Sequence, residues 1–266
     1  MKKTFLTSTI IFFSIWACGQ TTFQETYGGT KAEAAYEVKR TDDGGYIIAG
    51  ESLSYGAGAG FSDFYLVKVA SDGANQWAKT FGTSKTDEGR SVQQTNDGGY
   101  VVCGSTSSFG TAPGDCYLVK TSSNGDFQWS KTYGGTNDES ATSINLTSDG
   151  GYVMTGWTTS FCLGTGDMYV IKTSSDGTPE WLRNYGGTGL EYGESIQQTI
   201  DGGYIICGWT KSFGAGGNDV YLVKTASDGA LQWAKTYGGT SGDSGRSIQI
   251  TSDGGFIIAE IGRAHV

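Results

Sequence analysis

The sequence predicts an all-β protein and, more narrowly, a β-propeller of four-stranded antiparallel blades. Three observations lead to this prediction: a high glycine content, a strict internal repeat of about 52 residues, and four strand-like runs in each repeat. Glycine provides 44 of the 266 residues, with only two prolines and 13% aromatic residues. Frequent tight turns between aromatic and β-branched runs are typical of all-β proteins.

The repeat is marked by the phrase Asp-Gly-Gly followed by an aromatic residue. This phrase opens at five places: Asp43, Asp97, Asp149, Asp201 and Asp253. A tryptophan recurs every 52 residues, at Trp77, Trp129, Trp181 and Trp233. Repeats of this length indicate architectures in which each unit packs on its neighbours, such as propeller blades. We therefore expect four complete blades and a split or incomplete fifth within residues 20–259.

The fourth copy shows the four strand-like runs expected in every blade. They are residues 194–199, 204–210, 220–225 and 231–237. Asp-Gly-Gly separates the first two runs and Ser-Asp-Gly the last two, and both suit hairpin turns that need a positive φ. Apolar residues on both alternating faces, as in Tyr204-Ile205-Ile206-Cys207, indicate sheets that are covered on both sides.

The frame shared by the copies is GG-x3-D/E-x-small-x-S, G-Y/F-x3-G-x-T-x-S-F, D-x-Y-x-V/I-K and D/N-G-x3-W-x3-Y-G-G. This frame resembles the bacterial β-propeller repeat family often labelled SBBP, over nearly all of residues 23–259. The resemblance implies a propeller fold and an exported or surface protein, mostly without an assigned reaction. It points to a fold more specifically than to an activity.

The two ends of the repeat region are incomplete. Residues 23–29 match only the last strand of a repeat, and residues 246–259 match only the first two. The termini can therefore share one blade, which would lack its third strand. Residues 260–266 read EIGRAHV, depart from the pattern and contain the single histidine, His265. We expect this tail to be truncated or foreign.

The N-terminus predicts an export signal in residues 1–19. Two lysines precede an apolar run that is too short to span a bilayer. The end of this run, Ile15-Trp16-Ala17-Cys18-Gly19, resembles a bacterial lipobox, in which Cys18 would be acylated. The same residues also suit ordinary cleavage before Gln20. The sequence thus predicts either a lipoprotein of the outer membrane or cell surface, or a secreted protein.

The charge and the remaining cysteines exclude several classes of function. The net charge is -9 and no basic block follows Lys3, so nucleic acid is not an expected partner and a membrane is one only through the lipid anchor. Cys103 and Cys207 share a repeat position where other copies have alanine or threonine, which indicates small buried side chains. A bond between Cys116 and Cys162 is left open. Neither a CxxC pair nor a second histidine is present to suggest a metal site or a His-dependent triad.

Residues that recur in every blade are interpreted as scaffold, because catalysis requires an asymmetric cluster of groups. This interpretation covers the Asp-Gly-Gly turn, the tryptophans and the lysines that close the third run: Lys68, Lys120, Lys172 and Lys224. The turn typical of quinone-dependent propellers is missing, and no pair of carboxylates stands out for glycoside hydrolysis. We therefore expect no enzyme activity and no cofactor.

Five carboxylates precede the expected innermost strands: Glu33, Asp87, Glu139, Glu191 and Asp243. In a propeller they would form a ring near one end of the central channel, and such a ring could attract a cation. The favoured alternative is that each carboxylate accepts backbone N–H bonds that tie one blade to the next.

Trp157 and Trp209 break the repeat symmetry, because the other complete copies have Glu51 and Ser105 at this position. Two aromatic residues in adjacent blades could form a stacking platform for a sugar ring or an anchor for a protein. The alternative, which we favour, is that they only cover the blade edge.

The whole sequence predicts an exported, monomeric, non-catalytic module that binds a protein or glycan at the cell surface. The alternative is an extracellular propeller enzyme, active on glycans or dependent on a quinone.

Overall fold

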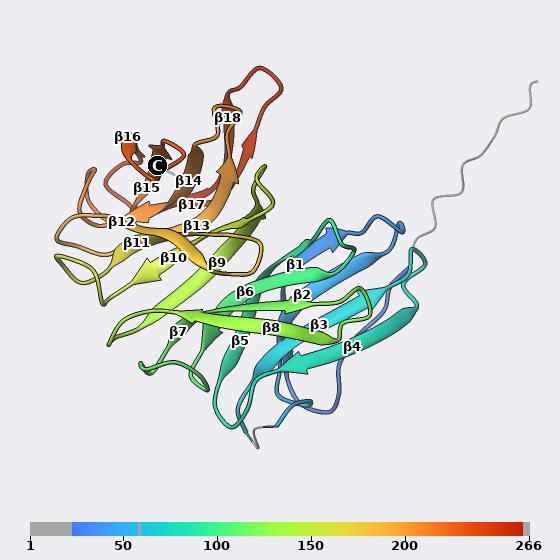
Figure 1. The fold of residues 1–266 in the computed structure, drawn as a ribbon. Coiled ribbons are helices and arrows are strands. Elements are labelled where there is room, and N and C mark those ends of the chain that lie inside the picture. The colour runs from blue at the N-terminus through green and yellow to red at the C-terminus, as the bar shows by residue number, and fades with distance from the viewer. Residues whose placement is uncertain (1–22, 58–59, 263–266) are drawn as a thin grey trace, which may run out of the picture.

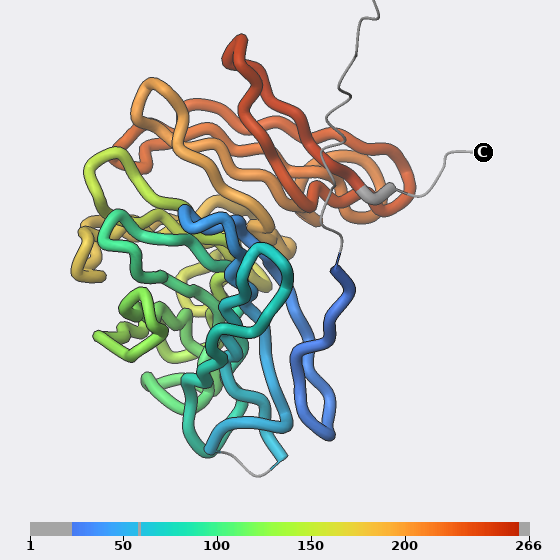
Figure 2. Tube along the Cα trace, turned by 90° about the vertical axis from the view of Figure 1, so that its right-hand side faces the viewer, coloured from blue at the N-terminus to red at the C-terminus, as the bar shows by residue number. Residues whose placement is uncertain are grey.

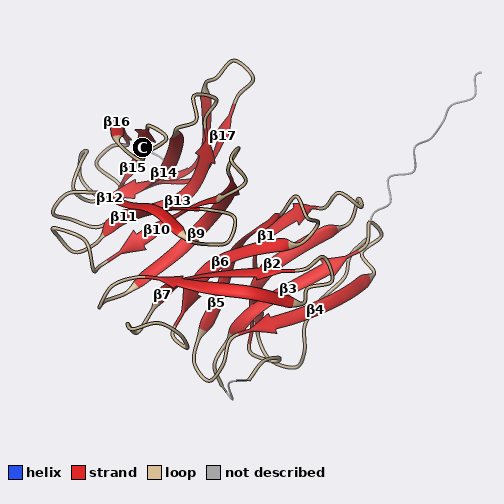
Figure 3. Cartoon of the chain, in the orientation of Figure 1, coloured by secondary structure: helices blue, strands red, loops and turns tan. Residues whose placement is uncertain are grey.

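The computed structural model describes residues 23–57 and 60–262 (Figure 1). The predicted export signal with Cys18 and the tail residues 263–266, including His265, lie outside the described residues. The regular elements of the described part are all strands (Figure 3). None of these residues forms a helix with the length and apolar character needed to cross a membrane.

The strands form four complete antiparallel sheets and one two-stranded sheet, and we number these sheets as blades 1 to 5. Blade 1 is β1 (Glu33–Arg40), β2 (Tyr46–Ser52), β3 (Asp63–Val69) and β4 (Asn75–Phe81). Blade 2 is β5 (Asp87–Gln94), β6 (Tyr100–Thr106), β7 (Asp115–Thr121) and β8 (Phe127–Tyr133). Blade 3 is β9 (Glu139–Leu146), β10 (Tyr152–Thr158), β11 (Asp167–Thr173) and β12 (Pro179–Tyr185). Blade 4 is β13 (Glu191–Gln198), β14 (Tyr204–Thr210), β15 (Asp219–Thr225) and β16 (Leu231–Tyr237), and blade 5 is β17 (Asp243–Ile250) and β18 (Phe256–Gly262). The predicted meander of four strands per repeat is confirmed.

The Asp-Gly-Gly phrase forms the turn between the first and second strands of each blade. In blade 3, Gly150 has a φ of +84°, a conformation that glycine adopts without steric cost. The Asp149 carboxylate accepts hydrogen bonds from the Gly151 N–H at 3.0 Å and from the Thr147 hydroxyl at 2.5 Å. The phrase that recurs most clearly in the sequence is therefore a structural turn.

Each complete blade contains a buried lysine that forms an ion pair with the aspartate of its Asp-Gly-Gly turn. The Lys172 side chain is only 2% exposed, and its Nζ lies 2.9 Å from the Asp149 carboxylate and 3.1 Å from that of Glu180. The same Nζ donates to the Thr173 carbonyl at 3.0 Å. Equivalent ion pairs join Lys68 to Asp43, Lys120 to Asp97 and Lys224 to Asp201. Each lysine thus connects the turn to the third strand of its own blade.

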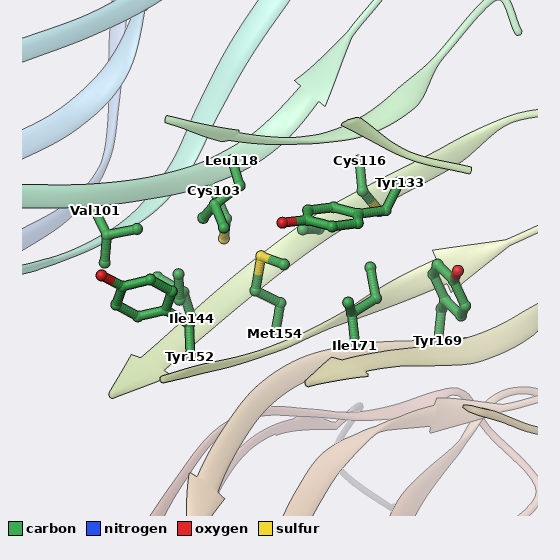
Figure 4. Close-up of a cluster of buried hydrophobic side chains, with 11 residues drawn as sticks. Val101, Cys103, Cys116, Leu118, Tyr133, Ile144, Tyr152, Met154, Tyr169 and Ile171 are labelled. Carbon is green, nitrogen blue, oxygen red and sulfur yellow. The ribbon is translucent and has the colours of Figure 1, made fainter. Parts of the chain in front are cut away.

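Apolar clusters fill the junctions between blades. Figure 4 shows the junction of blades 2 and 3, where Cys103 and Leu118 of blade 2 face Ile144, Tyr152 and Met154 of blade 3. Such contacts bury both faces of each interior sheet, which is the main favourable contribution to the stability of the stack. They also explain why both alternating faces of the second and third strands are apolar.

The four described cysteines are free thiols. Cys103 and Cys207 are fully buried, in agreement with the interpretation as small core residues. Cys116 is also buried, whereas Cys162 is half-buried in the loop between β10 and β11. The bond between Cys116 and Cys162 that the sequence left open is therefore not formed.

The five blades follow one another from the blue first blade to the red C-terminal hairpin in Figure 2. Residues 23–29 form no strand, yet they lie against blade 1 at the place that the fourth strand of a preceding blade would occupy. The Tyr27 hydroxyl donates to the Gly73 carbonyl at 2.7 Å, as Tyr133 does to Gly177 at 2.6 Å. In the described residues this segment is not hydrogen-bonded into the β17–β18 sheet. The two parts of the expected shared blade are thus present but not joined.

Candidate ligand-binding site

Each innermost strand contains a β-bulge at the same repeat position. The register between the first and second strands skips one residue in every blade, so that this residue has no direct partner. The skipped residues are Tyr36, Arg90, Thr142, Glu194 and Arg246. Bulges bend a strand and redirect a side chain, and they are common next to binding sites.

A glycine on the second strand faces the bulge in each complete blade. A Cβ atom on Gly208 would lie 1.7 Å from the Tyr192 carbonyl oxygen, and one on Gly156 would lie 1.8 Å from that of Ser140. Gly50 and Gly104 have the same close approach to the opposite strand. In the four complete blades, the repeated glycine therefore permits this close approach, whereas in blade 5 Glu260 stands at the same position opposite Gly245.

The five bulged residues line one cavity at the centre of the blades. This cavity has a volume of about 560 Å³, and its wall includes residues from the innermost strand of every blade. The residue after the bulge also contributes: Glu37, Ser91, Ser143, Ser195 and Ser247. Because the bulged residues are of four types, with arginine in blades 2 and 5, a repetitive scaffold forms the wall of an asymmetric cavity.

Three aromatic rings stack along one side of the cavity, across blades 3 and 4. The Tyr192 ring centroid lies 6.2 Å from that of Trp157 and 5.5 Å from that of Trp209, with interplanar angles of 24° and 3°. Tyr192 and Trp209 are directly opposite each other on β13 and β14, and both line the cavity. The structure thus brings the two predicted tryptophans into one aromatic cluster, with Trp209 at the cavity and Trp157 behind Tyr192.

Tyr192 and the bulged residues were not predicted as site residues. A signal for Tyr192 exists in the repeat alignment, because the other copies have Ala34, Glu88, Ser140 and Ser244 at this position. The bulged positions vary in the same way. Sequence variation alone does not show that a side chain points into the channel, since the bulge that directs it is a property of strand pairing.

The charged groups of the cavity are paired. Arg246 of blade 5 forms an ion pair with Glu194 of blade 4, and Arg90 pairs with Glu88. The Arg90 guanidinium also lies 4.0 Å from the centre of the Tyr36 ring, which is a cation–π contact. Burial raises the pKa of Glu194, and the Arg246 charge opposes this shift. The cavity therefore offers oriented donors and acceptors with little net charge.

The predicted carboxylate ring has a different geometry. Glu139 accepts hydrogen bonds from the Gly135 N–H at 2.8 Å, the Ser160 N–H at 3.1 Å and the Thr158 hydroxyl at 2.7 Å. Gly135 follows the last strand of blade 2, so this carboxylate ties the end of one blade to the start of the next. In the other four blades, the equivalent carboxylate also accepts a bond from a backbone N–H that precedes its strand. The donor and acceptor pairs are Gly29 and Glu33, Thr83 and Asp87, Gly187 and Glu191, and Gly239 and Asp243.

The five carboxylates do not converge on one point. Across residues 23–57 and 60–262, no group of three or more His, Cys, Asp or Glu side chains is arranged to hold a metal ion. The hydrogen bonds of these carboxylates are instead the inter-blade contacts that the sequence analysis favoured.

No protein-family model and no curated protein sequence matches this chain. Several solved structures are similar in fold. A Bacteroides caccae protein of unknown function is 16% identical, with 79% of this chain and 69% of that chain covered and a TM-score of 0.49. The Neurospora crassa Pan2 WD40 domain is 10% identical, with coverages of 86% and 63% and a TM-score of 0.47. A puromycin hydrolase variant is 14% identical, with coverages of 85% and 35% and a TM-score of 0.52.

These identities bear on the fold alone. Four-stranded antiparallel blades that repeat every 52 residues and pack face to face define the chain as a β-propeller. A fold of this kind does not by itself decide the activity.

Proposed function

We propose that this chain is an exported, non-catalytic propeller that binds a glycan in its central cavity. The observation that carries the proposal is the stack of Tyr192 and Trp209 at the wall of a cavity lined by bulged side chains of four residue types. The faces of tyrosine and tryptophan rings provide apolar surface on which a ligand can stack. The tyrosine O–H and the tryptophan N–H remain available for hydrogen bonds. Fixed polar groups beside them suit the hydroxyl groups of a sugar.

The dimensions favour a small ligand over a protein surface. A volume of about 560 Å³ lies within the range of small-molecule sites. The ion pairs and serines at the wall supply the few oriented polar groups that such sites use for specificity. A segment of an oligosaccharide is therefore the ligand class that we propose, with a protein ligand as the alternative.

An enzyme of the glycosidase type is less well supported. That chemistry needs one carboxylic acid and one carboxylate placed on either side of a glycosidic bond. The two carboxylates at the cavity wall are already engaged: Glu194 pairs with Arg246, and Glu37 accepts bonds from the Ser91 hydroxyl at 2.6 Å and the Val92 N–H at 2.8 Å. Both therefore support binding better than proton transfer.

The proposed location is outside the cytoplasm. The N-terminal signal pattern and the similarity to SBBP repeats support export, with either a lipid on Cys18 or release as a secreted monomer. Metabolic labelling with a fatty-acid analogue, compared between the native chain and Cys18→Ser, distinguishes these two forms.

The binding proposal is tested by screening the purified protein on a glycan array and then titrating the best oligosaccharide by calorimetry. Trp209→Ser should weaken binding at least about tenfold, because it removes the ring that faces the cavity. Trp233→Ser is the matched control, since Trp233 lies on the outer strand of the same blade and should leave the affinity unchanged. Absence of any glycan ligand, or equal affinity for Trp209→Ser and the native protein, would contradict the proposal.

A further inference from the structure

At the junction of blades 3 and 4, two buried carboxylates from different blades face each other. They belong to Asp167, the first residue of β11, and Glu191, the first residue of β13. A Cβ atom on Gly186 would lie 2.2 Å from Asp167 Oδ1 and 2.5 Å from Glu191 Oε2, so the two oxygens are closer together than the sum of these distances. Because position 186 is glycine, no side chain from that position separates them.

The same arrangement recurs at the two neighbouring junctions. Gly134 lies beside Asp115 Oδ1 and Glu139 Oε2, and Gly238 lies beside Asp219 Oδ1 and Asp243 Oδ2. None of the six residues that carry these carboxylates is more than 3% exposed. In these three blades, the first glycine of the Tyr-Gly-Gly phrase therefore marks a buried pair of carboxylates.

One oxygen of each aspartate has no hydrogen-bond donor among the described residues. Asp167 Oδ2 accepts a bond from the Asn184 amide at 2.5 Å, whereas Asp167 Oδ1 is buried without a partner. In Asp115 and Asp219, the bonds from loop N–H groups also go to Oδ2, at 2.9 to 3.3 Å. The remaining oxygen is the one that faces the carboxylate of the next blade. Buried polar atoms are normally paired, so this recurrent exception requires an explanation.

The carboxylate pairs also lack a compensating positive charge. The ion pairs found among the described residues include none of the six carboxylates. Burial raises the pKa of Asp167 and the charge of Glu191 adds to this effect, while the Asn184 hydrogen bond opposes it. Glu191 accepts hydrogen bonds on both oxygens, from Gly187 and Thr210. One shared proton would neutralise a single charge of each pair, whereas a divalent cation neutralises both.

We propose that each of these three junctions binds one Ca²⁺ ion between the aspartate of a third strand and the carboxylate that begins the next blade. A donor set of oxygens alone is typical of sites for hard cations. Two carboxylates per ion agree with the finding that, in the described part of the chain, no three such side chains converge. Backbone carbonyls and water complete the coordination of Ca²⁺ in sites of this kind.

The burial of the carboxylates favours Ca²⁺ over Mg²⁺. An ion at this depth must give up most of its bound water, which Mg²⁺ does reluctantly, and Mg²⁺ also demands a stricter geometry. The ion replaces repulsion between neighbouring blades by attraction. The stacking of the blades therefore depends on calcium.

The first test uses the full chain after treatment with a chelator. Calorimetric titration with CaCl2 alone should show saturable binding of at least three ions per chain, one for each of the three junctions. The melting temperature should rise by at least about 4 °C at about 5 mM CaCl2, because the ion binds only the folded state. MgCl2 should bind at least about tenfold more weakly. Absence of binding, or of any melting shift, at millimolar Ca²⁺ overturns the proposal.

A double variant separates ion binding from packing. Asp115→Asn combined with Asp167→Asn keeps an acceptor oxygen at each position but removes one charge from two pairs, so two fewer ions should bind. In chelator this variant should melt above the native chain, because the repulsion is relieved, and in CaCl2 the order should be reversed. Asp42→Asn is the matched control, since Asp42 lies exposed in a turn and its replacement should change neither result.

Two outcomes of this comparison contradict the calcium sites. The first is a double variant that binds as many ions as the native chain. The second is a native melting temperature that rises from about pH 7 to about pH 5 and does not respond to Ca²⁺, which would show that each pair holds a shared proton.

Discussion

At the scale of single residues, positions that recur in every blade are structural, whereas positions that differ between blades face the cavity. Lys172 and Asp149 recur in equivalent form in every complete blade and hold the turn against the third strand. The bulged residues differ from blade to blade and face the cavity. The rule that a residue repeated around a ring is structural agrees with the contacts of the lysines, the turns and the five carboxylates.

Replacement of the buried lysine is expected to destabilise blade 3. Lys172→Met leaves the Thr173 carbonyl and two carboxylates without their shared donor, and we expect a loss of about 2 kcal/mol in the free energy of unfolding, after allowance for the solvent exposure of both carboxylates. Urea denaturation measures this change. Lys211→Met, at an exposed position in the loop after β14, should alter it by less than about 0.5 kcal/mol. Equal stability of both variants would contradict the role assigned to Lys172.

The candidate site was predictable only in part. Trp157 and Trp209 could be found because they replace non-aromatic residues of other copies, and the structure places both in one stack. Their partner Tyr192 lies on a different strand, so the contact depends on pairing between β13 and β14. Arg246 and Glu194 come from two blades, and a sequence pattern does not encode their distance.

At the scale of elements, the strands and turns of the interior blades could be predicted well from the sequence. The second to fourth runs of blade 4 match β14, β15 and β16 to within one residue, because glycine turns fix both ends of each hairpin. The first strand begins at Glu191, three residues before the predicted Glu194. The reason is the bulge at Glu194, which interrupts the regular alternation of side chains while pairing continues on both sides.

The glycine opposite the bulge is expected to be sensitive to any side chain. In Gly208→Ala, the new Cβ would meet the Tyr192 carbonyl oxygen, so the two strands must separate. We expect a loss of about 3 kcal/mol in unfolding free energy, together with a change in tryptophan fluorescence from the disturbed stack. Gly242→Ala is the control: its nearest neighbour would be 3.9 Å away, so the stability should change little. A fully stable Gly208→Ala protein would contradict the importance of this close approach in blade 4.

At the scale of the whole molecule, stability is distributed over similar junctions between neighbouring blades. Four of the junctions have their own apolar cluster, and each complete blade has its own lysine and aspartate pair. Repeat architectures of this kind gain stability from the sum of local units and their interfaces. Conditions that weaken one type of repeated contact therefore act on all blades together.

Acid is such a condition. Hydrogen bonds and the charge of the neighbouring lysine outweigh the opposing effect of burial and lower the pKa of Asp43, Asp97, Asp149 and Asp201 from 3.8 to about 2. Because the pKa is lower in the folded state, this contribution is present above pH 3.8 and is lost as the pH falls towards 2. We expect the melting temperature to fall steeply between about pH 4 and pH 2. The fall should be smaller in Lys172→Met, which has already lost one pair, and a flat profile in the native protein would contradict this expectation.

The bulge has a consequence for how this protein can change over evolutionary time. Because the position that faces the cavity has no direct partner in the pairing of the first and second strands, its side chain can be exchanged without removing a pair from that ladder. The five positions already carry four residue types on one type of backbone, so the chemistry of the wall can vary while the blade geometry is kept. Ligand preference can therefore diversify by single substitutions while foldability is conserved, and a laboratory library confined to these five codons would explore the same variation.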